Sequence, residues 1–215
     1  MQVNILWGLG LLCAVAMPLA AQQASKTQQE YETVLRSKPD TVHGAQLFAK
    51  CAACHGIDGA GVQDGRVPAI ADQHFRVIAK ELVDFRHDKR WDALMEHYSD
   101  EHNLGDSQDL ADVAGYVSNL KPVRTSGLGN GEFVNDGAKI YSRSCASCHG
   151  AAAEGDNRKR VPRLASQHYA YLLRQLHDAV EGRRPNFPRE HVRLLARIDR
   201  SDFAAVADYL SRLSP

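Results

Sequence analysis

The 215-residue chain has no excess of charge of either sign and is poor in methionine and cysteine. Its 26 Lys and Arg balance 26 Asp and Glu, which does not fit a nucleic-acid-binding protein, because such proteins usually carry a strong basic excess. After residue 21 there is no apolar run long enough to cross a bilayer and no sustained polar-apolar alternation typical of a sheet. With 44% hydrophobic residues, the chain is an ordinary globular one of one or two domains.

The one long apolar run lies at the N-terminus. Residues 5–21 are uncharged, contain a proline near the end and finish in small residues, which predicts a signal peptide over residues 1–21 and export to the periplasm. No Lys or Arg precedes the run, and its 17 residues are near the lower limit for a membrane span, so an uncleaved anchor is the alternative. Residues 22–41 then form an N-terminal extension.

Without the signal segment four cysteines remain, and all of them fall in two copies of one pentapeptide. The copies are Cys51-Ala-Ala-Cys54-His55 and Cys145-Ala-Ser-Cys148-His149. Two thiols three positions apart can each form a thioether to one haem vinyl group, and the adjacent imidazole then reaches the iron. A thioredoxin-like pair gives no reason for the histidine, and a zinc site needs more ligands. The pentapeptides therefore predict two covalently bound haem c groups, with His55 and His149 as iron ligands.

The chain also contains an internal repeat. A shift of 94 residues aligns residues 51–104 with residues 145–198 without a gap. Beyond the pentapeptides, the matched pairs include Pro68/Pro162, Gln73/Gln167, His74/His168, Arg90/Arg184 and His97/His191. The repeat predicts two homologous domains, 42–121 and 132–215, joined by a Gly-, Ser- and Pro-rich linker at 122–131.

The hydrophobic periodicity inside each repeat is helical. It predicts helices over 44–50, 73–86 and 108–120 in the first repeat, and over 137–144, 167–181 and 202–213 in the second. Asp106 or Ser107, and Ser201, are candidate N-caps of the last helix of each repeat. Domains of this size have a marginal core, which a covalent haem would complete.

This arrangement resembles the dihaem cytochromes c of the cytochrome c4 type. The resemblance implies an all-α fold of two tandem class I cytochrome c domains, each a small helical fold around one covalent haem. It also implies that the carbonyl groups of Pro68 and Pro162 hold the proximal imidazoles. In the family, a glycine and an aromatic residue of the first helix pack on an aromatic residue of the last. The matching residues are Gly44, Phe48 and Tyr116 in the first repeat, and Gly137, Tyr141 and Tyr209 in the second.

The sequence departs from the family at the distal iron ligand. The family usually places a methionine seven residues before the apolar residue that precedes the last helix, and counting back in this way reaches His97 and His191. The second domain has no methionine at all. His97 and His191 are therefore the predicted distal ligands. The alternative distal ligands are Met95 or His102 for haem one and His168 for haem two. His74 and His168 match each other across the repeat, and the preferred interpretation of this pair is that they are surface residues or neighbours of the haem propionates.

Replacing a thioether ligand by imidazole lowers the potential of a haem, and two six-coordinate irons leave no open position for a substrate. The predicted function is one-electron transfer between redox protein partners, not catalysis, with transient docking to a membrane-bound complex. The alternatives are a haem enzyme, such as a peroxidase or a sulfur-compound oxidase, and a dedicated subunit of a larger complex. Residues 22–121 hold 11 basic and 16 acidic residues, whereas residues 122–215 hold 15 basic and 10 acidic residues. We expect this separation of charge between the two halves to orient charged redox partners. Six basic residues near haem two are interpreted as a docking or propionate-pairing group or as a solvated face: Arg158, Lys159, Arg160, Arg163, Arg183 and Arg184.

Overall fold

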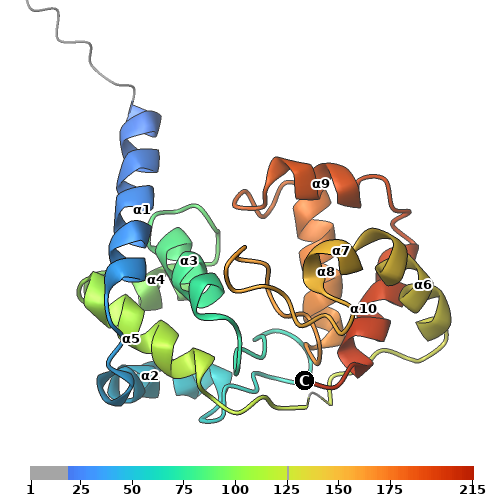
Figure 1. Cartoon of the computed structure of the whole chain (residues 1–215), viewed down its shortest axis with the longest axis horizontal. Helices are drawn as coiled ribbons and strands as arrows, with labels where there is room; N and C mark the ends of the chain where they lie inside the picture. The colour runs from blue at the N-terminus through green and yellow to red at the C-terminus, as the bar shows by residue number, and fades with distance from the viewer. Residues whose placement is uncertain (1–18, 125) are drawn as a thin grey trace, which may run out of the picture.

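The computed structural model describes residues 19–124 and 126–215 (Figure 1). The predicted signal segment lies outside these residues except for its last three, which begin the first helix. Within the described residues, regular structure is helical apart from one isolated bridge between Asp156 and Val161. None of the described helices has the length and apolar character needed to span a membrane.

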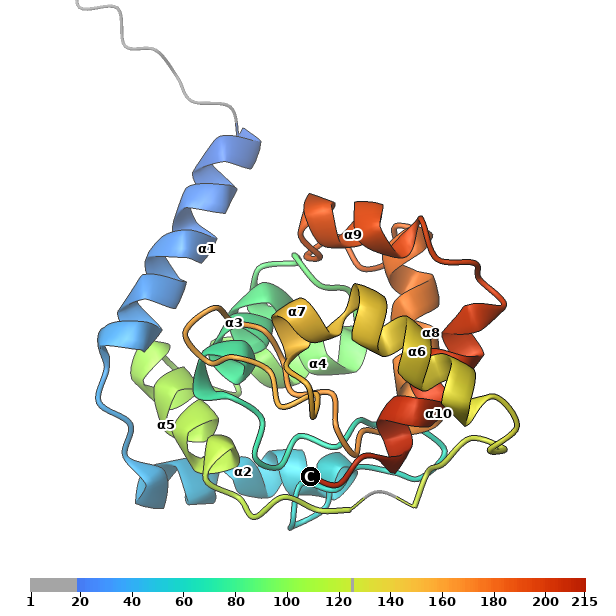
Figure 2. The same ribbon diagram turned by 45° about the vertical axis from the view of Figure 1, so that its right-hand side comes forward.

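The helices form two similar groups, one per repeat, which lie side by side (Figures 1 and 2). The first group is α1 (Leu19–Arg36), α2 (Thr41–His55), α3 (Phe75–Arg86), α4 (Ala93–Ser99) and α5 (Ser107–Ser118). The second is α6 (Val134–Ser144), α7 (Ala146–His149), α8 (Tyr169–Val180), α9 (Arg189–Leu195) and α10 (Asp202–Arg212). The predicted all-α fold of two tandem domains is confirmed.

In each domain the helix that leads into the cysteine motif, α2 or α6, crosses the last helix, α5 or α10, at a glycine. A Cβ atom on Gly44 of α2 would lie 2.1 Å from the carbonyl oxygen of Asp112 in α5, and one on Gly137 of α6 would lie 2.0 Å from that of Ala205 in α10. Any side chain at either glycine would therefore force the helices apart. This close crossing sets the frame on which the haem-binding residues are held.

Aromatic pairs next to these crossings lock the same helices. The ring centroids of Phe48 and Tyr116 are 5.2 Å apart, and those of Tyr141 and Tyr209 are 5.6 Å apart, both in tilted arrangements. Such pairs stabilise a contact beyond the area they bury. The helix packing implied by the family resemblance is confirmed in both domains.

The two predicted caps behave differently. Asp106 caps α5, because its carboxylate accepts hydrogen bonds from the backbone N–H groups of Gln108 and Asp109. Ser201 occupies the N-cap position of α10, as predicted, but its side chain makes no capping bond to the helix. Its hydroxyl and backbone N–H both donate to the carboxylate of Asp199 instead.

The helices predicted to begin at Gln73 and Gln167 begin two residues later, because both glutamines bind the other domain. The Gln73 amide donates to the carbonyl of Arg163 at 3.0 Å and accepts from its N–H at 3.0 Å. The Gln167 amide makes the same pair of bonds to Ala69, at 2.7 and 3.0 Å. Ala69 and Arg163 directly follow Pro68 and Pro162, the two prolines that match across the repeat. Each glutamine therefore binds the proline-containing loop of the other domain, and the interface is reciprocal.

The histidines after these glutamines also join the domains. His74 Nε2 lies 2.9 Å from the carbonyl oxygen of Glu154, and His168 Nε2 lies 2.8 Å from that of Ala60. His168 is only 3% exposed. These contacts correct the interpretation of the pair as surface residues: both are interface residues.

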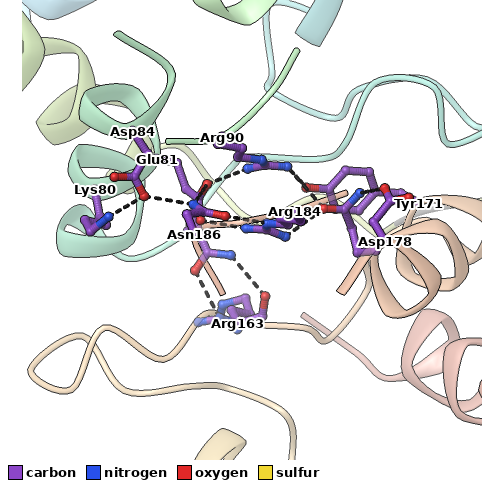
Figure 3. A network of polar contacts seen from close by, with 11 residues as sticks. Lys80, Glu81, Asp84, Arg90, Arg163, Tyr171, Asp178, Arg184 and Asn186 are labelled. Carbon is purple, nitrogen blue, oxygen red and sulfur yellow. Dashed lines mark hydrogen bonds and ion pairs between the residues drawn. The ribbon is translucent and has the colours of Figure 1, made fainter. Parts of the chain in front are cut away.

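A charged cluster extends the interface between α3 and α8 (Figure 3). The carboxylate of Glu81 accepts hydrogen bonds from Arg90 at 2.6 Å and from Arg184 at 2.7 Å, and both arginines also donate to the amide oxygen of Gln175. Glu81 and Gln175 occupy matching repeat positions, as the two arginines do. Burial alone would raise the pKa of Glu81, but the two guanidinium groups outweigh it and lower the pKa to about 2.

Candidate haem sites

Each proximal histidine is the last residue of a helix, His55 of α2 and His149 of α7. His55 Nδ1 lies 3.1 Å from the carbonyl oxygen of Pro68, and His149 Nδ1 lies 3.1 Å from that of Pro162. A ring that donates from Nδ1 to a carbonyl leaves Nε2 free for a metal. Burial lowers the pKa of both histidines against the opposing effect of these bonds. Both imidazoles are therefore neutral at pH 7, which is the form that binds iron.

In each motif the first cysteine is partly buried and the second is exposed. Cys51 and Cys145 pack against the cores of their domains, whereas Cys54 and Cys148 are exposed. Burial raises the pKa of Cys51 and Cys145 to about 11. In each motif the two thiols and the histidine are spaced three and four residues apart, so they lie on one side of the helical turn. This is the arrangement that two vinyl groups and one iron of a single haem require.

An open hollow of about 540 Å³ lies beside the second motif. Its lining residues come from the end of α6, from α7, from the end of α9, from the segment between α9 and α10, and from the start of α10: Arg143, Ser144, Ser147, Leu194, Arg197, Ile198, Asp199 and Asp202. Ser144 and Ser147 are neighbours of Cys145 and Cys148 in the chain. The side of domain two that carries the exposed thiol is thus accessible from solvent.

His191 of α9 faces the proximal histidine of domain two. The ring centroids of His191 and His149 are 6.0 Å apart with an interplanar angle of 44°, and Phe187 packs on His191 at 5.1 Å. A metal held between one nitrogen of each ring, at the roughly 2 Å typical of metal–imidazole bonds, needs about this separation. Burial, followed by the charges of His149 and Arg184, lowers the pKa of His191 to about 4. The residues of domain two therefore fit a haem iron between two neutral imidazoles.

The structure does not repeat this arrangement with His97. The His97 side chain is 61% exposed, its Nδ1 lies 3.6 Å from the carboxylate of Asp100, and its ring packs edge-on against Tyr98. His102, the other alternative, is also exposed. Among the described residues, no ring contact like that of His149 and His191 joins His55 to His97.

Met95 occupies the place in α4 that His191 occupies in α9. Both helices have seven residues, and each of these side chains is on the third. The helices begin two repeat positions apart, because Asp92 caps α4 through the N–H groups of Leu94 and Met95, whereas α9 begins after Pro188. Matched repeat positions therefore fall at different points along the two helices: His97 is the fifth residue of α4, whereas His191 is the third residue of α9.

The surroundings of Met95 agree with this equivalence. Its side chain is partly buried and packs against the core of domain one, as does Cys51. Asp92 lies close enough to His55 for its charge to oppose the lowering of the pKa of His55. The first turn of α4 is therefore near the proximal histidine.

Sequence reasoning missed several residues that shape these sites. It did not identify Phe187 beside His191, nor Arg143 and Arg197 beside the hollow. It also missed Arg86, which bonds to the segment after Met95. At the position that matches Arg86 in the repeat, domain two has Val180. This difference between the repeats was the one feature of the sequence that could have drawn attention to Arg86.

Comparison with known proteins agrees with this geometry. The family model described as cytochrome c matches twice, over residues 41–121 and 134–214. A cytochrome c4 of Pseudomonas aeruginosa is 31% identical over 182 residues, covering 81% of this chain and 89% of the relative. A thiosulfate dehydrogenase electron acceptor of Stutzerimonas stutzeri is 28% identical and covers 98% of this chain and 96% of its own length.

A solved structure gives the same result for the fold. The structure of reduced recombinant cytochrome c4 from Pseudomonas stutzeri superposes with a TM-score of 0.74 at 27% identity, covering 82% of this chain and 100% of that one. The two family matches account for both cysteine motifs and both proximal histidines. The chain belongs to the cytochrome c family and is a dihaem electron-transfer cytochrome of the c4 type, with two covalently attached haem c groups.

Proposed function

We propose that the protein is a periplasmic electron carrier whose two haems have different distal ligands. In this proposal His149 and His191 ligate haem two, and His55 and Met95 ligate haem one. The facing rings of His149 and His191, with centroids 6.0 Å apart, are the observation that carries it. The N-terminal apolar segment and the covalent haem sites support export to the periplasm.

For haem one the proposal departs from the sequence prediction of His97. Met95 shares the helix position of His191 and packs inward, whereas His97 is on the exposed side of α4. A thioether also needs no hydrogen-bond partner when it is buried, so it suits the apolar surroundings of Met95.

The ligand sets separate the two sites in potential. When bound, each haem supplies one-electron redox chemistry at its iron. A methionine ligand raises the potential relative to a second imidazole, so the domain-two site is the lower of the two. The electron donor therefore meets domain two, and the acceptor meets domain one.

The surface of domain two fits an acidic donor. Arg143 and Arg197 are exposed and line the hollow beside the second motif; these two residues are called the arginine rim below. Of the six basic residues singled out in the sequence, Arg163 pairs with Asp72 and Arg184 pairs with Glu81. Those two arginines join the domains and are not available for docking.

Ferric near-infrared spectra of the holoprotein test the ligand assignment. A charge-transfer band characteristic of thioether sulfur on iron is expected, and Met95→Ala should abolish it while His97→Ala leaves it unchanged. A potentiometric titration should show two separate one-electron steps in the unmodified protein. If both haems instead give bis-imidazole spectra, and His97→Ala removes the bis-imidazole spectrum of haem one, the assignment of Met95 to haem one is overturned.

A dedicated acceptor for a sulfur-oxidising enzyme is the second candidate function. The relative named thiosulfate dehydrogenase electron acceptor aligns over 98% of this chain, whereas the cytochrome c4 of Pseudomonas aeruginosa aligns over 81%. Isolation of the protein from its host in a stable complex with such an enzyme would support this role. Binding of carbon monoxide to the unmodified protein would instead indicate an open iron and a catalytic haem.

A further inference from the structure

We propose that helix α1 positions the distal-ligand segment of haem one through Glu30 and Arg86. The segment runs from α4 to the start of α5, residues 93–106, and its role at haem one rests on the function proposed above. In this arrangement Glu30 and Arg86 are positioning residues: neither is proposed to touch the haem.

Arg86 connects three parts of domain one. It is the last residue of α3, and its side chain is only 4% exposed. Nε donates to the carbonyl of Ser99 at 2.7 Å, and Nη2 donates to that of Leu104 at 2.9 Å. Nη1 donates to the carboxylate of Glu30 at 2.6 Å. One guanidinium group thus holds both ends of the loop between α4 and α5 and is itself held by α1.

The backbone that Arg86 binds belongs to the same short element as Met95. Ser99 ends α4 and is fully buried, and its hydroxyl donates to the carbonyl of Met95 at 2.7 Å. A shift of Ser99 would therefore be transmitted directly to the turn that carries Met95. Arg86 fixes Ser99 through a charge-assisted hydrogen bond, which is stronger than a neutral one.

Helix α1 is anchored well enough to perform this task. Tyr31 and Val34 are buried in the core of domain one, and the Tyr31 hydroxyl donates to the carbonyl of Arg76 in α3 at 3.2 Å. Glu30 also contacts Nε2 of His87 at 2.5 Å, so its two oxygens serve both residues at the end of α3. All of α1 precedes residue 41, where the family match begins. The helix is therefore an addition to the cytochrome fold and not part of it.

Domain two holds the equivalent segment in another way. Val180 takes the place of Arg86, and Leu195 ends α9 as Ser99 ends α4. Val180 and Leu195 lie in one apolar cluster with Ala179 and Phe203. Apolar packing against α8 and α10 therefore fixes the α9 segment, without a counterpart of α1 or of the Glu30–Arg86 pair. The dependence on α1 is specific to haem one.

Removal of Glu30 would leave a buried cation without its anion. Loss of one partner from a buried ion pair is strongly destabilising, because the remaining charge is desolvated and uncompensated. The least costly response is for Arg86 to move toward water, which breaks its bonds to Ser99 and Leu104. The segment then opens, and Met95 is held at the iron less firmly.

Carbon monoxide binding to the ferrous holoprotein tests the proposal. Glu30→Ala is expected to raise the rate of carbon monoxide binding at haem one by about tenfold, the change that corresponds to loss of one buried charge-assisted contact. Haem two should stay closed. Glu32→Ala is the matched control, because Glu32 is exposed on the same helix and bonds only to Gln28 among the described contacts. Glu30→Gln, which keeps an acceptor for Arg86, should have a smaller effect than Glu30→Ala.

A double-mutant cycle separates positioning from general destabilisation. If Glu30 acts through Met95, then Glu30→Ala should add nothing to carbon monoxide binding in a Met95→Ala background. Equal opening of both haems, or an equal effect of Glu32→Ala, would overturn the proposal. If Met95→Ala itself leaves haem one closed, the ligand assignment fails. If Met95→Ala opens haem one but neither Glu30→Ala nor Glu30→Gln changes it, the role of α1 fails.

Discussion

The rings of His149 and His191 face each other with their centroids 6.0 Å apart, while the sequence counterpart of His191 in domain one is exposed to solvent. The matched helices α4 and α9 also begin two repeat positions apart. If Met95 ligates haem one as proposed, the same duplicated fold holds two haems with unequal ligands and unequal potentials.

The distal role of His191 makes a direct prediction for haem two. His191→Ala should leave that iron five-coordinate, so that the ferrous protein shows a high-spin spectrum for haem two and binds one carbon monoxide per chain. His168→Ala is the control, because His168 is buried in the interface with Nε2 against the carbonyl of Ala60. If His168→Ala opened the iron and His191→Ala did not, the assignment would be wrong.

The pH dependence of haem two follows from the burial of His191. Its pKa falls from about 6.5 for free imidazole to about 4 in the folded protein. The folded chain then binds fewer protons than the unfolded chain between these values. Its stability is therefore fully present above about pH 6.5 and decreases as the pH falls toward 4.

Acid titration of the ferric holoprotein measures this effect. The low-spin signal of haem two should be constant between about pH 8 and pH 7, and a high-spin signal should grow in only below about pH 4, because the iron competes with the proton for the His191 nitrogen. The thioether band of haem one should persist to lower pH, because methionine sulfur has no proton to gain in this range. Simultaneous loss of both signals at one pH would contradict the unequal ligand sets.

The parts of the fold that could be predicted from sequence depend on local spacing. The thioether and iron-ligand chemistry of the pentapeptides is fixed within five residues, and the glycine at each helix crossing has a steric role that no other residue can fill. The 94-residue repeat also matched Gln73 and His74 with Gln167 and His168, but it did not reveal their place at the interface. Their partners are backbone carbonyl and N–H groups of the other domain, which leave no trace in a residue pattern.

Two features could not be predicted because tertiary contacts decide them. Helix α1 is rich in Gln and other polar residues, and its buried stripe is short, so the contacts of Tyr31 and Val34 with the core stabilise it. The exposure of His97 depends on the local fold of α4, which Asp92 caps. A register argument assumes that matched residues of α4 and α9 have matching surroundings, whereas His97 is exposed and His191 packs against His149 and Phe187.

The buried cluster at the interface predicts a stability effect. Glu81→Gln removes the anion between Arg90 and Arg184, whose side chains are 14% and 15% exposed. The free energy of unfolding should fall by about 3 kcal/mol, the lower end for breaking a buried ion pair, since these groups retain some exposure. Denaturant unfolding of the holoprotein measures it.

An exposed pair gives the control for Glu81→Gln. Asp136→Asn breaks the salt bridge to Lys139, in which the Asp136 side chain is 59% exposed and the Lys139 side chain is 75% exposed. It should change the free energy of unfolding by less than about 1 kcal/mol. Equal effects of the two substitutions would show that the interface cluster does not stabilise the domain pair.

The arginine rim gives a prediction for electron-transfer kinetics. Arg143 and Arg197 are exposed beside the second motif, where Asp199 and Asp202 offset their charge, but residues 122–215 as a whole hold 15 basic and 10 acidic residues. An acidic donor should therefore be steered to domain two at low ionic strength. Stopped-flow reduction by such a donor should slow as salt rises, because screening shortens the range of attraction to about 10 Å at 0.1 M.

Charge reversal at the rim separates steering from a change in the haem itself. Arg197→Glu should lower the association rate with the acidic donor roughly tenfold or more at low salt and should weaken the salt dependence, while the haem-two potential changes little. Arg212→Glu is an unsuitable control, because Arg212 bonds to Asp208 and the carbonyl of Gly129. Lys139→Glu is the better one, because Lys139 is an exposed cation on the same helix as Arg143 and does not line the hollow. Since both substitutions change the net charge equally, a general field effect would slow the two variants to the same extent. A larger loss for Arg197→Glu would assign the donor to the hollow beside Cys145 and Cys148, and an equal loss would remove that assignment.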